Sequence, residues 1–151
     1  METSANYKAN LNELLASYQL HYQNLRALHW NIQGSKFFEL HLKYEELYNR
    51  VQLIIDELAE RILTLNGRPL FTFSDYLAKS AIQENALIVD GNEGMNYVLR
   101  AQKALLQLER KLLLEAQEIN DEGTSAFLSD LIREKEKTNW MFSAWLNNHG
   151  E

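Results

Sequence analysis

One stretch of the chain repeats apolar residues at alternating steps of three and four, and it limits the possible folds more than any other feature. The stretch runs from residue 37 to residue 65, about eight helical turns. Its repeating positions are Phe37, His41, Tyr44, Tyr48, Val51, Ile55, Leu58, Ile62 and Leu65. This spacing is typical of an amphipathic helix. Because the 151 residues include one proline and six glycines, few turns are available, and we expect long helices with few connections.

Similar apolar spacing predicts three further long helices. The first begins between residues 4 and 10 and ends near residue 32, the third spans about 92–120, and the fourth follows a turn at 121–124 and runs to about 146. Ser35 is the expected N-cap of the second helix, and Gly67 is its expected left-handed C-cap, followed by Pro69. Between residues 70 and 91 we expect a long crossover with a short helix that Ser74 caps.

Two short turns and one long connection define the expected topology. Four long helices joined in this way are typical of the all-α, ferritin-like four-helix bundle with a single crossover. We expect residues 1–151 to form one such domain, since the sequence contains no repeat or linker. A bundle without any functional site remains an alternative at this point, because bundles have many functions.

The composition of the chain restricts the metal ligands and the partners that it can have. The chain has no cysteine, so any metal must be bound by His, Asp, Glu or backbone groups. The net charge of −6 argues against a nucleic-acid footprint over the whole surface. The longest apolar run is only Ala86 to Val89, and the first ten residues lack the features of a secretion signal. We therefore expect a cytoplasmic protein that does not use a membrane as a partner.

Two histidines flank the first turn. His29 lies just before it, on the apolar side of the first helix, and His41 lies just after it. A single histidine at such a position is more often a core residue than a ligand. Because the two helices are antiparallel neighbours, however, the two rings can approach each other, and the sequence predicts a paired imidazole site.

Three carboxylates of the second helix point away from its apolar stripe. With His41 at zero on a helical wheel, Glu45 lies about 40° round, Asp56 about 60° and Glu60 about 100°, while the stripe centres near 280°. On a monomer these acids would form an ordinary solvated face. The usual di-iron site inside a bundle is not expected, because it needs Glu-x-x-His pairs and the chain has none.

A dimer offers another arrangement. His41 and Asp56 lie about 22 Å apart on one helix and cannot bind the same ion. If two copies of this helix pack antiparallel around a twofold axis near Tyr48 and Asn49, His41 of one copy meets Asp56 and Glu60 of the other. Two symmetric sites would result, with nitrogen and oxygen ligands that suit iron, manganese or zinc.

Several separated motifs resemble one family, the Dps mini-ferritins (DNA-binding proteins from starved cells), over nearly the whole chain. The motifs are His29-Trp30-Asn31-x-x-Gly34-x-x-Phe37, Leu40-His41-x-x-Tyr44, Asp56-x-x-Ala59-Glu60-Arg61, Asp121-Glu122-Gly123-Thr124 and Glu136-Lys137-Thr138-x-Trp140-Met141. The resemblance implies a hollow homododecamer built from twofold dimers, with an iron-oxidising site at each dimer interface.

The resemblance also implies residue roles. His29 and His41 would bind iron from one subunit, and Asp56 and Glu60 from its twofold mate. The resemblance implies three further roles. Glu45 would be a supporting ligand, Trp30 would lie beside the iron, and Asp121 and Asp130 would be acids of the threefold pores. Plain packing for Trp30, and ordinary helix-end positions for the two aspartates, are the alternatives.

The expected function is that of a ferroxidase for iron storage and detoxification. It would oxidise ferrous iron, preferably with hydrogen peroxide, store ferric mineral and so protect DNA, with zinc or manganese as possible competitors. The alternatives are a non-enzymatic metal-binding cage and a DNA-compacting nucleoid protein. Tight DNA binding is not expected, because Lys8 is the only basic residue among the first ten. A local patch built from Lys8, Lys36 or Lys43 of neighbouring subunits is the exception that would permit it.

Overall fold

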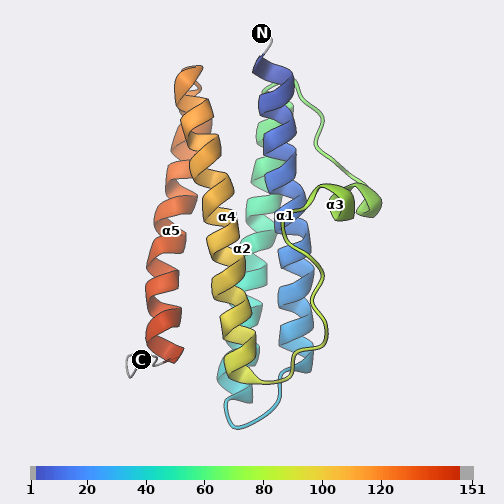
Figure 1. Ribbon diagram of the computed structural model, residues 1–151, viewed down its shortest axis with the longest axis vertical. Helices are drawn as coiled ribbons and strands as arrows, with labels where there is room; N and C mark the ends of the chain where they lie inside the picture. The colour runs from blue at the N-terminus through green and yellow to red at the C-terminus, as the bar shows by residue number, and fades with distance from the viewer. Residues whose placement is uncertain (1–2, 147–151) are drawn as a thin grey trace. The chain divides into compact units, whose positions relative to one another are not determined.

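The computed structural model describes residues 3–146, which form five helices and no strand (Figure 1). The helices are α1 (Thr3–Asn31), α2 (Phe37–Thr64), α3 (Phe73–Lys79), α4 (Gly91–Glu118) and α5 (Glu122–Leu146). All four predicted long helices and the short crossover helix are confirmed, although α1 begins one residue before the predicted range. Within the described residues, no helix is both long and apolar enough to cross a membrane.

The chain divides into two compact units, Met1–Gly94 and Met95–Glu151. In the first unit, α1 and α2 are antiparallel and adjacent along their length, since His29 contacts His41 near one end and Lys8 lies against Gly67 at the other. The buried residues of α2 are Leu40, Tyr44, Val51, Ile54, Leu58 and Ile62. They lie on the side of the helix that the apolar stripe predicted, whereas Asp56 and Glu60 are exposed.

The turn between α1 and α2 differs from the prediction at its cap. Gly34 has a positive φ of 109°, and the Phe37 amide donates to the Gly34 carbonyl at 3.1 Å. This turn places Lys36 at the N-cap position of α2, and its side chain makes no capping hydrogen bond. The prediction that Ser35 caps α2 is therefore wrong, because the turn delays the helix by one residue.

At the other end of α2, the left-handed residue is Asn66, with φ of 65°, and not Gly67 as predicted. Asparagine tolerates this conformation better than most residues do. Gly67 is needed for space instead, since a Cβ atom there would lie 2.9 Å from Ile62 Cγ2 and 3.1 Å from Lys8 Cδ. The glycine thus permits a close approach of α1 to the end of α2.

The crossover packs on α1 through hydrogen bonds to α1 side chains. The Ser17 hydroxyl accepts from the Ala81 amide at 2.8 Å, and Asn24 donates to the Gln83 carbonyl at 2.9 Å. Thr72, and not the predicted Ser74, is the N-cap of α3, because its hydroxyl accepts from the Asp75 amide. The sequence offered both hydroxyls, and the helix begins early enough to use the first.

Tyr44 and Gly94 form a tight contact between α2 and the first turn of α4. A Cβ atom at Gly94 would lie 2.5 Å from the Tyr44 hydroxyl oxygen. That hydroxyl is buried and has no hydrogen-bond partner in the described part of the chain. Burial, and secondarily the Asp90 carboxylate, raise the pKa of the Tyr44 phenol, so it is neutral at physiological pH.

We expect Gly94→Ala to lower the free energy of unfolding by about 1–3 kcal/mol, because the new methyl group overpacks against the hydroxyl. Alanine normally stabilises a helix relative to glycine, so a loss of stability in Gly94→Ala would itself indicate the overpacking. Tyr44→Phe removes the oxygen and should be close to neutral alone. Urea unfolding of both single variants and the double variant measures this coupling; equal costs of Gly94→Ala in the two backgrounds would contradict it.

In the second unit, α4 and α5 are antiparallel and share polar contacts. Gln102 donates to Thr138 Oγ1 at 3.0 Å, and Arg110 pairs with Glu136 at 3.0 Å. Lys135 and Glu109 form a fully buried ion pair of 3.0 Å. These contacts fix the pairing of α4 and α5 at several positions along the two helices.

Candidate metal centre

The His29 and His41 rings are stacked on each other. His29 belongs to the last turn of α1 and His41 to the first turns of α2, and their ring centres lie 3.7 Å apart with 13° between the ring planes. His29 is buried and His41 is half-buried. The structure thus confirms that the turn brings the two predicted histidines together.

Each histidine is held by the backbone of the other. His29 Nδ1 lies 2.6 Å from the His41 carbonyl oxygen, and His41 Nδ1 lies 2.7 Å from the His29 carbonyl oxygen. A carbonyl can only accept, so each Nδ1 must carry the proton. In the neutral rings, each Nε2 therefore keeps a free lone pair, which is the form of histidine that binds a metal ion.

Glu45 brings a carboxylate of the same chain close to His29. Its Oε1 lies 3.9 Å from His29 Nε2, and its side chain is about half exposed. An oxygen at this position can bind the same cation as the imidazole, although 3.9 Å is too long for a direct hydrogen bond. The proposed supporting role of Glu45 therefore stays a prediction, with a geometry that suits it.

Asp56 and Glu60 do not reach the histidines of their own chain. Both are exposed and lie in the second half of α2, whereas His41 lies near its start. Within residues 3–146, no group of three or more His, Asp or Glu side chains could hold a metal ion. The rise of the helix explains this result, since about 22 Å separate the Cα atoms of His41 and Asp56.

Exposed apolar side chains share the outer side of α2 with these acids. They are Phe38, Leu42, Leu53 and Leu63. Helical geometry places them within about 80° of Asp56 on the wheel. A mixed apolar and acidic row of this kind is typical of a surface that another protein covers, and less so of a freely solvated face.

Aromatic rings surround the histidine pair. Tyr48 lies edge-on to His29 with ring centres 5.4 Å apart, and Phe37 stacks on His41 at 4.9 Å. Tyr22 in turn contacts Tyr48 at 5.9 Å. Tyr48 and Phe37 were not predicted to belong to the site, although each lies three or four residues from a histidine or acid of the site.

Trp30 is 55% exposed and points away from the core. Its ring lies 5.0 Å from the guanidinium carbon of Arg26, one turn earlier on α1. Packing in the interior of its own subunit is therefore not the role of Trp30. A position beside bound iron stays a prediction. Arg26 was not predicted as a neighbour of Trp30, although it lies four residues from both Tyr22 and Trp30.

The two proposed pore acids have local partners. Asp121 Oδ1 accepts from the Thr124 amide at 3.1 Å and so caps α5, as the turn at 121–124 predicted. Asp130 pairs with Arg133 at 2.9 Å. These contacts account for both residues as helix-end and surface groups, and their pore roles stay predictions. His149 lies outside the described residues.

The profile of the ferritin-like domain matches residues 8–149. The chain is 40% identical over 138 residues to DNA protection during starvation protein 2 of Bacillus anthracis, covering 91% of this chain and 94% of that one. This chain belongs to the Dps family of ferritin-like proteins.

Solved structures agree with this membership. A Dps protein from Vibrio cholerae, described as a member of the ferritin-like diiron-carboxylate superfamily, superposes with a TM-score of 0.93 at 52% identity and covers 95% of this chain and 90% of its own. A Dps protein from Bacillus brevis gives a TM-score of 0.94 at 32% identity, with 97% and 98% covered. The predicted ferritin-like four-helix fold is thereby confirmed.

Proposed function

We propose that this protein is a ferroxidase whose metal site is shared between two subunits. The observation that carries the proposal is the histidine pair, whose reciprocal Nδ1 hydrogen bonds leave both Nε2 atoms available for a cation. The exposed acids of α2 supply the oxygen ligands that one chain cannot bring to this pair. The names of the relatives, which refer to DNA protection and diiron-carboxylate proteins, support the same function.

Ferrous iron is the substrate in this proposal. His29 and His41 bind it through Nε2, and Asp56 and Glu60 of the partner subunit complete the site with carboxylate oxygens. Two ferrous ions give one electron each to hydrogen peroxide, which with two protons leaves as two water molecules. The carboxylates favour the ferric product, because their negative charge stabilises the additional positive charge. Glu45 adds a further oxygen, and zinc or manganese compete for the same nitrogen and oxygen ligands.

The twofold dimer is the unit of a larger cage in this proposal. Six dimers form a hollow homododecamer, ferrous iron enters through threefold pores lined by Asp121 and Asp130, and ferric mineral collects in the cavity. DNA is protected because ferrous iron, which generates hydroxyl radicals from peroxide, is removed from solution in the cytoplasm or near the nucleoid.

Tight DNA binding is not part of the proposal. Lys8 lies against Gly67 at the end of the α1–α2 pair opposite to the turn that contains Lys36, and Lys43 is paired with Glu46 at 2.8 Å. The three lysines therefore do not form one patch within a subunit. The net charge of −6 per chain adds a general repulsion for phosphate.

Stoichiometric oxidation of added ferrous iron, followed by ferric absorbance with peroxide or oxygen as the oxidant, tests the proposal. We expect wild-type protein to consume one peroxide per two ferrous ions, faster than with oxygen. His29→Ala and His41→Ala should each lower the initial rate by 10-fold or more while light scattering still shows the cage. A wild-type monomer, or histidine variants with the wild-type rate, would refute it.

A further inference from the structure

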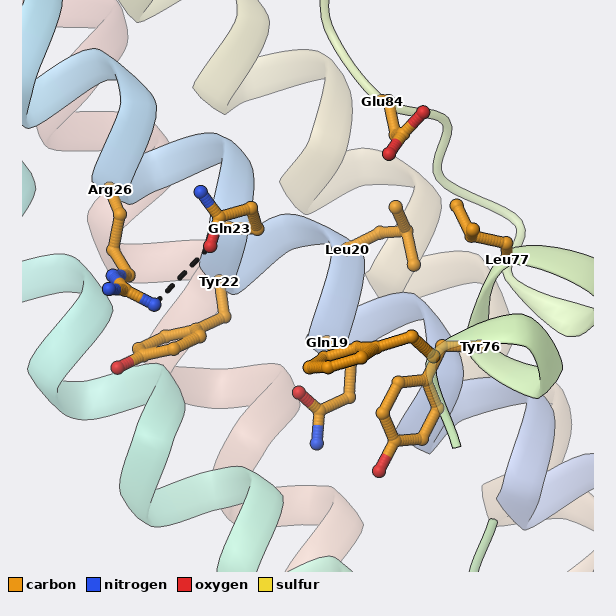
Figure 2. A pocket seen from close by; sticks show the side chains of 9 residues that line it. Gln19, Leu20, Tyr22, Gln23, Arg26, Tyr76, Leu77 and Glu84 are labelled. Atoms are coloured by element: carbon orange, nitrogen blue, oxygen red, sulfur yellow. Dashed lines mark hydrogen bonds between the residues drawn. The ribbon is translucent and has the colours of Figure 1, made fainter. Parts of the chain in front are cut away.

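Arg26 is held in one place beside the candidate metal site. Its guanidinium carbon lies 5.3 Å from the centre of the Tyr22 ring and 5.0 Å from the centre of the Trp30 ring. Its Nη1 also donates a hydrogen bond to Gln23 Oε1 at 3.3 Å. Figure 2 shows the guanidinium beside the Tyr22 ring. Both side chains line a groove of about 380 Å³ to which α1 and α3 contribute. Two cation–π contacts and one hydrogen bond thus restrict this side chain.

No carboxylate of the described residues neutralises the charge of Arg26. Among residues 3–146 it forms no ion pair with a carboxylate, and the contacts above are all neutral. Some other basic residues are paired, since Lys43 pairs with Glu46 and Arg133 with Asp130. A guanidinium remains protonated at every physiological pH, so the positive charge is permanent.

This charge is close to the histidine pair. Arg26 precedes His29 by three residues on α1, and side chains at this spacing are neighbours on one helix face. Trp30, whose ring lies near the guanidinium, follows His29 directly in the chain. Tyr22, the other ring near the guanidinium, contacts Tyr48, whose ring contacts His29. The aromatic groups around the guanidinium therefore also connect it to the site.

We infer that Arg26 sets the affinity of the shared site by repelling the divalent cation that binds there. This inference rests on the proposed function, and it assigns to Arg26 a role through its charge and not through contact with the ion. A unit charge on the order of 10 Å from a divalent ion changes the affinity roughly 4- to 300-fold for effective dielectric constants between about 80 and 20. Because Arg26 is half exposed, the effect should be near the lower end, about tenfold.

Calorimetric titration of the metal-free assembled protein with Zn²⁺ tests the inference without any oxidation chemistry. Arg26→Gln removes the charge but keeps a polar side chain that can lie on Tyr22, and we expect it to bind Zn²⁺ about tenfold more tightly than wild type at low salt. The advantage should shrink as ionic strength increases, since screening weakens the repulsion. Arg26→Lys keeps the charge and should stay within about threefold of wild type.

The outcomes separate this inference from the proposed function. Equal affinities for wild type and Arg26→Gln, equal changes in Arg26→Gln and Arg26→Lys, or loss of the assembly in Arg26→Gln would each overturn the electrostatic role. His29→Ala serves as the control for the site itself. If His29→Ala binds Zn²⁺ as well as wild type does, the shared site is refuted. The proposed role of Arg26 is then refuted as well, because it depends on that site.

Discussion

Assemblies made only of His41→Ala subunits, or only of Asp56→Ala subunits, will oxidise ferrous iron slowly, whereas co-assembled mixtures of the two will regain activity. The reason is the distance of about 22 Å between these residues on one helix, because of which the proposed site combines His41 of one subunit with Asp56 of the partner subunit. In a mixed dimer, one site contains both substituted residues and the other site contains neither. Random pairing at equal amounts makes half of the dimers mixed, so about a quarter of all sites should be intact.

A second mixture is the matched control. His29 and His41 stack within one subunit, so a mixture of His29→Ala and His41→Ala subunits leaves one damaged histidine pair in every site. This mixture should show no recovery above its components. Initial rates of ferrous oxidation, measured on mixtures whose dimer composition is verified by native mass spectrometry, give both results. Recovery in neither mixture would argue against a site shared across the dimer.

The sequence predicted the helices well because the relevant signal is repeated many times. The stripe from residue 37 to residue 65 contains nine positions, and a deviation at one of them does not move the helix. The same wheel correctly separated the buried side of α2 from the exposed Asp56 and Glu60. Approach of His29 to His41 followed from antiparallel pairing alone.

Single-residue signals at helix ends were less informative. Thr72 and Ser74 are both good N-cap residues, and only the backbone course of the crossover decides between them. Asn66 and Gly67 can both adopt positive φ, and the space that Lys8 and Ile62 leave at Gly67 is a tertiary property. That residues 1–151 form a single domain, and that the site is completed by a second subunit, stay predictions.

The reciprocal hydrogen bonds of the histidine pair lie beyond sequence reasoning for a related physical reason. Each bond joins a side chain of one helix to the backbone of the other, and a carbonyl has no sequence signature. The charge of Arg26 is visible in the sequence, but its lack of a carboxylate partner in the described chain depends on where every acid lies in space. The consequence is that ligand identity is easier to read from sequence than ligand orientation or affinity.

The buried ion pair between α4 and α5 gives the largest expected effect on stability. Lys135 Nζ lies 3.0 Å from Glu109 Oε2, and the two side chains are only 5% and 0% exposed. Lys135→Met preserves most of the side-chain volume but removes the ammonium that lies 3.0 Å from the Glu109 carboxylate in a site of low dielectric constant. We expect the apparent free energy of unfolding per subunit to fall by about 3–5 kcal/mol.

The double variant Glu109→Met, Lys135→Met distinguishes the cost of an isolated charge from the value of the pair. Both charges are then absent, and methionine can fill irregular space between the helices. We therefore expect stability to return to within about 2 kcal/mol of wild type, or to exceed it, because replacing a buried ion pair by apolar groups is often neutral. Urea unfolding followed by circular dichroism at one fixed protein concentration measures all three chains, since assembly contributes to apparent stability. A double variant as unstable as Lys135→Met alone would contradict this expectation and would mean that the 3.0 Å ion pair itself fixes the packing of α4 on α5.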